Sequence, residues 1–215
     1  KLIEQGKVLV NGQGAGMGQQ VEETDTVQGG KKILQGKQTQ KVLAFYKPGG
    51  VTCTERDPQA EKKIMDMIRY PERLTYAGRL DKDSEGLILL TNDGDLINAM
   101  MRGANRHEKE YIVKTDREIT PDFLEKMAKG IYLKDLDITT RECEIEQIGK
   151  FTFRIVLTQG VNRQIRRMCE ACGYRVKALK RIRIMNVLLG DLKPGKWRGV
   201  TGEELEQLQR DTGML

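Results

Sequence analysis

Two charged residues stand just before an apolar run that is typical of a buried strand. In the stretch YAGRLDKDSEGLILLTNDGDL, residues 76–96, Arg79 and Asp81 flank Leu80, and LILL follows at residues 87–90. A carboxylate at the mouth of such a strand can work as a nucleophile or a base when a cation keeps it ionised. It can equally form an ion pair that only fixes the loop. The spacing alone favours neither alternative.

A partner for this carboxylate stands in a second stretch, NRQIRRMCEACG, residues 162–173. Its apolar residues recur at the spacing of one helix face: Ile165, Met168, Cys169 and Cys172. The pattern predicts a helix that buries this face and ends at Gly173. Arg166 falls at the edge of the buried face, where a half-desolvated guanidinium requires a carboxylate. We therefore expect Arg166 to hold Asp81 ionised at the floor of a basic cleft.

The positive charge of the chain is concentrated around this helix. The net charge of the 215 residues is +6, but residues 163–183 hold eight basic side chains against the single acid Glu170, a local net charge of +7. The eight are Arg163, Arg166, Arg167, Arg175, Lys177, Lys180, Arg181 and Arg183. This concentration is typical of a protein that binds nucleic acid, although a solvated basic face without a partner has the same composition. Arg163 and Arg167 point away from the apolar face and are expected to be free for phosphates.

The cysteines and the single histidine offer little chemistry. The four cysteines are too few and too scattered for a disulfide framework: Cys53, Cys143, Cys169 and Cys172. Cys169 and Cys172 have C-x-x-C spacing, but a structural zinc site needs four ligands and the sequence has no second pair. We therefore expect two small apolar side chains on one helix face, and no metal. His107 is expected to be a surface or RNA-contacting residue.

The composition indicates a protein without a membrane span. The hydrophobic fraction is 38%, no run of 18 apolar residues occurs, and the first ten residues, KLIEQGKVLV, lack the apolar core of a signal peptide. Cysteines present as free thiols suit a reducing compartment. These features predict a soluble, cytoplasmic protein.

The elements that must position the charged residues alternate without strict strand–helix–strand order. Strands are expected at residues 41–47, 87–92, 111–115 and 151–159, and helices after Asp57 with Pro58, after Thr120 with Pro121, and after Thr201, where Glu204 would complete a capping box. In the strand from residue 151, alternation predicts that Phe151, Phe153, Ile155 and Leu157 share the buried face and that Thr152, Arg154, Val156 and Thr158 lie on the other face of a half-buried strand. Strands that outnumber helices predict an α+β fold with a largely antiparallel sheet.

Four blocks of this sequence together resemble the RNA pseudouridine synthases of the RsuA family, most closely its RluF-like ribosomal large-subunit members. The blocks are GRLDKDSEGLILLTNDGDL (78–96), HEKEYIV (107–113), QGVNRQIRRMCEACGY (159–174) and LKRIRIMNV (179–187). Their order makes the resemblance specific, and it covers almost the whole chain. It implies a partial S4-like RNA-binding domain in residues 1–36, a linker at 37–40 and a catalytic domain in 41–215. Ser84 stands where many relatives have Thr, which leaves the chemistry untouched.

The resemblance also assigns roles to single residues. Asp81 of GRLD matches the family's catalytic aspartate, and Arg79 the basic residue that helps fill the space left by a flipped-out uridine. Tyr111 of HEKEY matches a tyrosine that packs on the target base, and Arg166 the basic partner of the aspartate. Leu179 matches an aliphatic contact on the other face of the base. Together with Arg163 and Arg167, the basic residues Lys180, Arg181 and Arg183 are expected to bind RNA.

The implied reaction is isomerisation of a uridine in ribosomal RNA, expected to be 23S rRNA, to pseudouridine, without cofactor or metal. Two other classes remain open at this level. A non-catalytic S4-type RNA-binding or ribosome-assembly factor would explain the basic segment but leaves Asp81 without a purpose. A hydrolase with an aspartate nucleophile would explain Asp81, but its usual second carboxylate is not identifiable, since Asp83 and Glu85 are better explained as a solvated turn.

Overall fold

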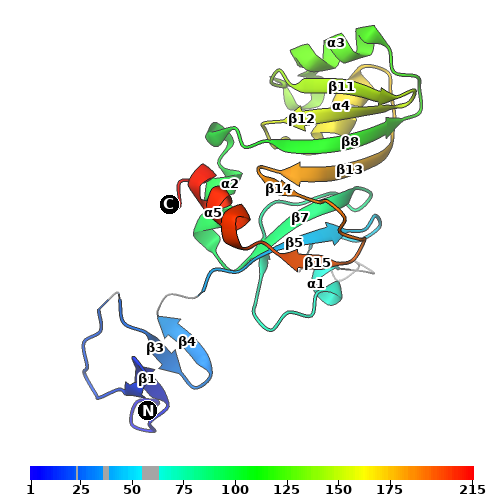
Figure 1. Ribbon diagram of the computed structural model, residues 1–215. Helices are drawn as coiled ribbons and strands as arrows, with labels where there is room; N and C mark the ends of the chain where they lie inside the picture. The colour runs from blue at the N-terminus through cyan, green and yellow to red at the C-terminus, as the bar shows by residue number, and fades with distance from the viewer. Residues whose placement is uncertain (23, 36–38, 55–62) are drawn as a thin grey trace. The chain divides into compact units, whose positions relative to one another are not determined.

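The computed structural model describes residues 1–22, 24–35, 39–54 and 63–215, and the chain divides into two compact units, Lys1–Gln40 and Lys41–Leu215. The described part of the first unit forms a small antiparallel sheet (Figure 1). Its strands, in spatial order, are β2 (Gln13–Gly14), β1 (Val8–Val10), β3 (Val27–Gly29) and β4 (Lys32–Gln35). The assignment of this unit to a partial S4-like domain stays a prediction.

The second unit is built on one large mixed sheet, which confirms the α+β prediction (Figure 1). Its main path runs in the order β11 (Glu144–Gly149), β12 (Thr152–Leu157), β8 (Lys109–Thr115), β13 (Val176–Ile184), β7 (Glu85–Thr91), β5 (Val42–Lys47) and β15 (Trp197–Gly199). Two short strands extend it, β14 (Val187–Leu188) on β13 and β6 (Thr75–Tyr76) on β7. Among the strands described, only β7 and β13 pair in parallel.

The remaining elements of this unit are short. The α-helices are α1 (Ile64–Met67), α2 (Gly94–Met101), α3 (Pro121–Lys129), α4 (Gln164–Ala171) and α5 (Gly202–Asp211). Two 3₁₀ turns, η1 (Gly103–Asn105) and η2 (Lys134–Leu136), and a small hairpin of β9 (Tyr132–Leu133) and β10 (Ile138–Thr139) complete the unit. The expected helix start at Asp57 and Pro58 lies outside the described residues. No helix in the described ranges is both long and apolar enough to cross a bilayer.

The apolar run of β7 is buried on both faces of the sheet. Leu87 and Leu89 belong to one core cluster, and Ile88 and Leu90 belong to a second cluster that also holds Phe45. Because successive side chains of a strand point to opposite faces, a strand covered on both sides has no polar face. This explains why LILL shows no alternation.

A third core cluster fills the space between the other half of the sheet and helices α3 and α4. Phe153, Ile155 and Leu157 of β12 are buried there, as the alternation predicts. Two expectations for this strand were wrong. Phe151 is 38% exposed because it lies in the turn before β12, and Val156 is buried because β12 is an inner strand, flanked by β11 and β8.

The ends of two helices test the capping predictions. In α3, the Thr120 hydroxyl accepts a hydrogen bond from the Phe123 amide, and Pro121 opens the helix as predicted. In α5, the predicted capping box is absent, since the Thr201 side chain makes no capping hydrogen bond. Glu204 instead accepts hydrogen bonds from Arg198 at 2.6 and 3.0 Å. An available guanidinium therefore outcompetes the helix end for this carboxylate.

Gly86 allows β7 and β13 to approach closely. Its φ is +114°, and a Cβ at this position would lie 2.3 Å from the carbonyl oxygen of Arg181 and 2.6 Å from its amide nitrogen. Backbone atoms cannot move aside as a side chain can. The parallel pairing of Arg181 with Gly86 therefore depends on glycine.

We expect Gly86→Ala to lower the free energy of unfolding by about 3 kcal/mol, because strain and a backbone clash add. The measurement is urea denaturation of the wild type and the variant. Gly94→Ala is the matched control, because Gly94 opens α2 and an added Cβ meets nothing within 4 Å. Equal denaturation midpoints for Gly86→Ala and the wild type would contradict this account of the strand junction.

A candidate active site at the parallel strand junction

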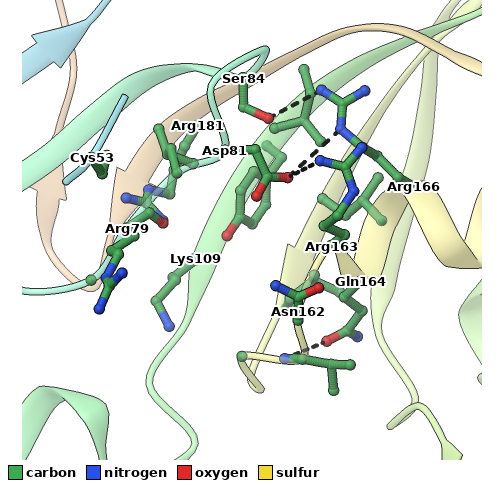
Figure 2. Close-up of a pocket in the computed structure, with 18 of the residues that line it drawn as sticks. Cys53, Arg79, Asp81, Ser84, Lys109, Asn162, Arg163, Gln164, Arg166 and Arg181 are labelled. Carbon is green, nitrogen blue, oxygen red and sulfur yellow. Dashed lines mark hydrogen bonds and ion pairs between the residues drawn. The ribbon is translucent and has the colours of Figure 1, made fainter. Parts of the chain in front are cut away.

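A pocket of about 550 Å³ opens beside the junction of β7 and β13 (Figure 2). Its size lies within the range usual for small-molecule sites. Seven candidate site residues from the sequence line it, from four different segments: Arg79, Asp81, Tyr111, Arg163, Arg166, Leu179 and Arg181. The structure thus brings together residues that are about 100 positions apart. Their catalytic roles stay predictions.

The loop that carries Asp81 is fixed by a buried lysine. Lys47, at the end of β5, is 0% exposed, and its ammonium donates hydrogen bonds to the carbonyl oxygens of Pro48 at 2.8 Å, Lys82 at 3.0 Å and Ser84 at 2.5 Å. Burial lowers the pKa of this ammonium. The three carbonyls satisfy its three donors, so Lys47 holds the segment after Asp81 against β5.

The carboxylate of Asp81 is held at one of its two oxygens. Its Oδ2 lies 3.1 Å from Nη1 of Arg163 and 3.8 Å from Nε of Arg166 (Figure 2). Arg166 also donates from Nη2 to the Ser84 hydroxyl at 3.1 Å, and its side chain is only 14% exposed. Oδ1 of Asp81 has no partner among the described residues. One oxygen is therefore oriented by two guanidinium groups while the other is available to a bound molecule.

The predicted proximity of Arg166 and Asp81 is present, but Arg163 is placed differently from the expectation. Arg163 was expected to point away from the apolar face of the helix, free for phosphate, because the helical pattern was extended through it. The helix begins at Gln164 instead, and Arg163 is its N-cap with φ 52° and ψ 35°, in the left-handed region. This backbone conformation breaks the 100° rotation per residue and lets the side chain reach Asp81.

Arg167 also has partners of its own. Its Nε donates to the carbonyl oxygen of Asn162 at 2.9 Å, and its Nη1 lies 3.8 Å from the exposed Asp135 carboxylate. The expectation that Arg167 is free is therefore wrong for the unbound protein. Because Asp135 is exposed, this ion pair contributes little and water screens it.

Tyr111, Leu179 and Arg79 surround the pocket from three directions. Tyr111 on β8 is half-buried and pairs in register with Arg181 of β13, while Leu179 is 6% exposed. Arg79 is exposed, and its side chain has no hydrogen-bond or ion-pair partner in the part of the chain that the structure describes. An aromatic ring, an aliphatic side chain and an exposed cation suit a planar base attached to an anionic backbone.

The three basic residues of β13 that are expected to bind RNA also have partners within the fold, and their role in RNA binding stays a prediction. Lys180 lies over the ring of Tyr46, 5.5 Å from its centroid. Arg183 forms ion pairs with Glu108 and Glu110. Arg181 is only 2% exposed and donates to the Leu87 carbonyl at 2.7 Å. The +7 segment is thus largely built into the fold rather than spread over a surface.

Cys169, Cys172 and His107 do not line the pocket that holds Asp81. Burial raises the pKa of Cys169 to about 12, and burial also raises that of Cys172, so both remain thiols at neutral pH. Cys169 lies on α4 and Cys172 is its C-cap, and both pack in the core cluster beneath this helix. The His107 ring lies 3.2 Å from the Ala99 carbonyl oxygen and does not line the pocket. No group of three potential metal ligands occurs in the described ranges.

Sequence reasoning did not single out three groups of this site: Lys47, Ser84 as a partner of Arg166, and Lys109, which lines the pocket. Lys47 could have been found, because it continues the apolar run VLAFY, where a lysine must be buried or end the strand. Ser84 and Lys109 carry no comparable signal, since isolated polar residues are common on surfaces.

Comparison with known proteins places this geometry in one family. The profile of RNA pseudouridylate synthase matches residues 41–171. The dual-specificity RNA pseudouridine synthase RluF of Escherichia coli K12 is 43% identical over 210 residues, which are 97% of this chain and 71% of that protein. An uncharacterised RNA pseudouridine synthase of Aquifex aeolicus is 33% identical over 98% of this chain and 89% of that protein.

A further relative and a solved structure agree. The ribosomal large subunit pseudouridine synthase B of Vibrio cholerae is 32% identical over 97% of this chain and 68% of that protein. A crystal structure of pseudouridylate synthase superimposes with a TM-score of 0.75 and 27% identity, over 96% of this chain and 90% of that one. The resemblance that the four sequence blocks predict is confirmed, and the chain belongs to the RNA pseudouridine synthase family.

Proposed function

We propose that this protein converts a uridine in ribosomal RNA to pseudouridine, with Asp81 as the reacting carboxylate. The observation that carries the proposal is the setting of Asp81, whose Oδ2 is held by Arg163 and Arg166 while Oδ1 is available in the pocket. Among the residues that the structure describes, six cations and one carboxylate line the pocket: Arg79, Lys82, Lys109, Arg163, Arg166 and Arg181, with Asp81. Such a pocket suits a polyanionic substrate that reacts with the carboxylate at one position.

The chemistry exchanges one bond of C1′ for another. The N1–C1′ bond of uridine breaks, the uracil turns while it stays bound, C5 bonds to C1′, the proton on C5 leaves, and N1 takes up a proton. Asp81 starts this sequence by attacking C1′, by attacking C6 of the base, or by removing the C2′ proton. No oxidation, reduction or addition of water occurs in the net reaction. The chemistry therefore requires no cofactor.

A base in a stem or stacked loop cannot reach a carboxylate inside a pocket, so the target uridine must be flipped out. Tyr111 and Leu179 line the pocket and are the proposed contacts on the two faces of the uracil. Arg79 is exposed, and we assign it the space that the flipped nucleotide leaves. A flexible guanidinium can both fill that space and contact the neighbouring phosphates.

The relatives named for RNA modification point to the partner. One is a dual-specificity RNA pseudouridine synthase and another a ribosomal large subunit synthase. On this basis the proposed substrate is 23S rRNA or a precursor of the large subunit, and Lys1–Gln40 is proposed to assist as a partial S4-like RNA-binding unit. Because bacterial ribosomes assemble in the cytoplasm, we propose that the protein works there.

Tritium release tests the proposed function. A 23S rRNA transcript that contains [5-³H]uridine should lose tritium to water when it is incubated with the protein, because C5 exchanges its hydrogen for the bond to C1′. A transcript labelled at C6 is the matched control and should keep its tritium. If the C5-labelled transcript releases no tritium above the enzyme-free background, the proposed function is wrong.

Tyr111→Phe should separate stacking from proton transfer. The ring can still pack on the uracil, but the phenolic oxygen that could accept or relay the C5 proton is gone. We expect RNA affinity within about twofold of the wild type and a rate of product formation lower by about 100-fold. Single-turnover assays with excess enzyme measure both. A Phe variant as fast as the wild type would leave Tyr111 as a stacking platform only.

A further inference from the structure

A second group of cations lines the pocket on the other side of Asp81 from Arg163 and Arg166. Figure 2 shows Arg79, Lys109 and Arg181 there. Lys109 opens β8 with a half-buried side chain that lines the pocket. Its ammonium has no hydrogen-bond or ion-pair partner among the residues that the structure describes. A half-buried ammonium without an acceptor is unusual, because each hydrogen bond to water that is lost on burial must be replaced by a hydrogen bond to another acceptor.

Arg181 is the neighbour of Lys109 and is also incompletely satisfied. Its Nε donates to the Leu87 carbonyl and its Nη1 to the Arg79 carbonyl at 3.4 Å, which fixes the guanidinium beside the Arg79 loop. Its Nη2 is buried and has no hydrogen-bond partner in the described part of the chain. Leaving such a donor unpaired is costly. Burial, and then the positive charge of Arg181, lower the pKa of Lys109. Two like charges thus share this part of the pocket without an anion.

Asp81 does not form an ion pair with Lys109 or Arg181. Its Oδ2 is taken by Arg163 and Arg166, and none of its atoms is within ion-pair distance of Lys109 or Arg181. Among the residues that the structure describes, Asp81 is the only acid that lines the pocket, which favours an anion supplied by the bound molecule. In a nucleotide of an RNA chain, the anions nearest to the base and ribose are the phosphodiesters on the 5′ and 3′ sides of that ribose.

We propose that Lys109, supported by the fixed guanidinium of Arg181, binds the phosphodiester adjacent to the target uridine. The contact anchors the ribose while the uracil detaches and turns, so that C1′ stays opposite Asp81. Lys109 is a substrate-binding residue in this account. The inference rests on the proposed function for the identity of the nucleotide, but the phosphate contact itself is measured by binding.

The first test is the salt dependence of RNA binding. Lys109→Met, Lys109→Arg and the wild type are titrated by fluorescence anisotropy with a hairpin copied from the 23S rRNA position that the wild type converts. Lys109→Met should bind about tenfold more weakly, and its slope of log affinity against log salt should fall by roughly 0.7 to 0.9, the value of one phosphate contact. Lys109→Arg should bind like the wild type. Lys114→Met is the matched control, because Lys114 is exposed on the same strand and outside the pocket.

The second test locates the phosphate. Two hairpins carry one neutral methylphosphonate each, on the 5′ or the 3′ side of the target uridine. At the contacted linkage, the methylphosphonate should weaken wild-type binding about tenfold but weaken Lys109→Met much less, because the variant has already lost the contact. At the other linkage, the methylphosphonate should weaken binding by the wild type and by Lys109→Met by the same factor.

Several results would overturn the subsite. One is that Lys109→Met has the same affinity and salt slope as Lys114→Met. Another is that each of the two methylphosphonates weakens binding by Lys109→Met by the same factor as it weakens binding by the wild type. A normal affinity with a lost chemical step would assign Lys109 to the reaction instead. If the wild type converts no position of 23S rRNA, the proposed function fails. The salt titration is then run on the whole 23S transcript and still decides whether Lys109 contacts phosphate.

Discussion

Asp81→Asn is expected to abolish pseudouridine formation while RNA affinity stays close to that of the wild type. The amide keeps the shape of the carboxylate, and its oxygen can still lie beside Arg163 and Arg166. It loses the negative charge that makes the group a nucleophile or a base. We expect the single-turnover rate to fall by at least about 10³-fold, which corresponds to about 4 kcal/mol of transition-state stabilisation.

Asp83→Asn is the matched control for this variant. Asp83 lies two residues away in the same loop, is exposed and does not line the pocket. It should retain the rate of the wild type. Turnover by Asp81→Asn within a few fold of the wild type would remove Asp81 from the reaction, and equal losses in both variants would indicate that only the loop was disturbed.

The second large effect is expected for Arg166→Met. Arg166 connects Ser84 to Asp81 and is mostly buried, and its Nε lies 3.8 Å from Asp81 Oδ2 without a hydrogen bond of its own. Methionine keeps much of the side-chain volume but removes the charge, so Asp81 loses the buried cation that faces its Oδ2. We expect a rate about 100-fold lower in single turnover, with a smaller change in RNA affinity.

Arg163→Met is the informative comparison. Arg163 makes the shorter contact to Asp81, 3.1 Å, but its side chain is 43% exposed, so water can replace it. We expect a smaller loss of rate than for Arg166→Met, together with weaker RNA binding. A variant at Arg166 that reacts as fast as the wild type, or a larger loss at Arg163, would show that burial does not rank the two arginines.

The central pair of the site could be predicted from the sequence, since local rules determine both of its members. Asp81 lies just before an apolar strand, and Arg166 lies on a regular helix at the edge of its buried face. The same helical rule misplaced Arg163, because the left-handed N-cap lies outside the regular helix. The direction of a side chain at a helix end depends on the φ value of that residue. The spacing of residues in the sequence does not reveal this value.

The charge count predicted a basic segment, but not where its side chains lie. Arg181 and Arg183 follow each other on β13 by two positions, yet one is buried against Leu87 and the other forms ion pairs with Glu108 and Glu110. Net charge describes a segment as a whole. Burial depends on neighbouring strands, which are far away in the sequence.

The pairing of β7 with β13 is the main feature of the fold that the sequence could not supply. The α+β class follows from the excess of strands, but this parallel pair joins Gly86 to Arg181 across almost half the chain. Long-range pairing carries no local signal other than the glycine that permits it. The pocket depends on this junction, since Asp81 precedes β7 while Leu179 and Arg181 lie on β13.

Mapping of new pseudouridines tests the central claim most directly. Unmodified 23S rRNA transcript is incubated with the wild-type protein or with Asp81→Asn, treated with a carbodiimide that remains on pseudouridine after alkali, and read by reverse transcription. The account predicts discrete stops with the wild type, at unchanged RNA chain length, and none with Asp81→Asn. Stops that are absent with the wild type, or that coincide with base loss or strand cleavage, would contradict it.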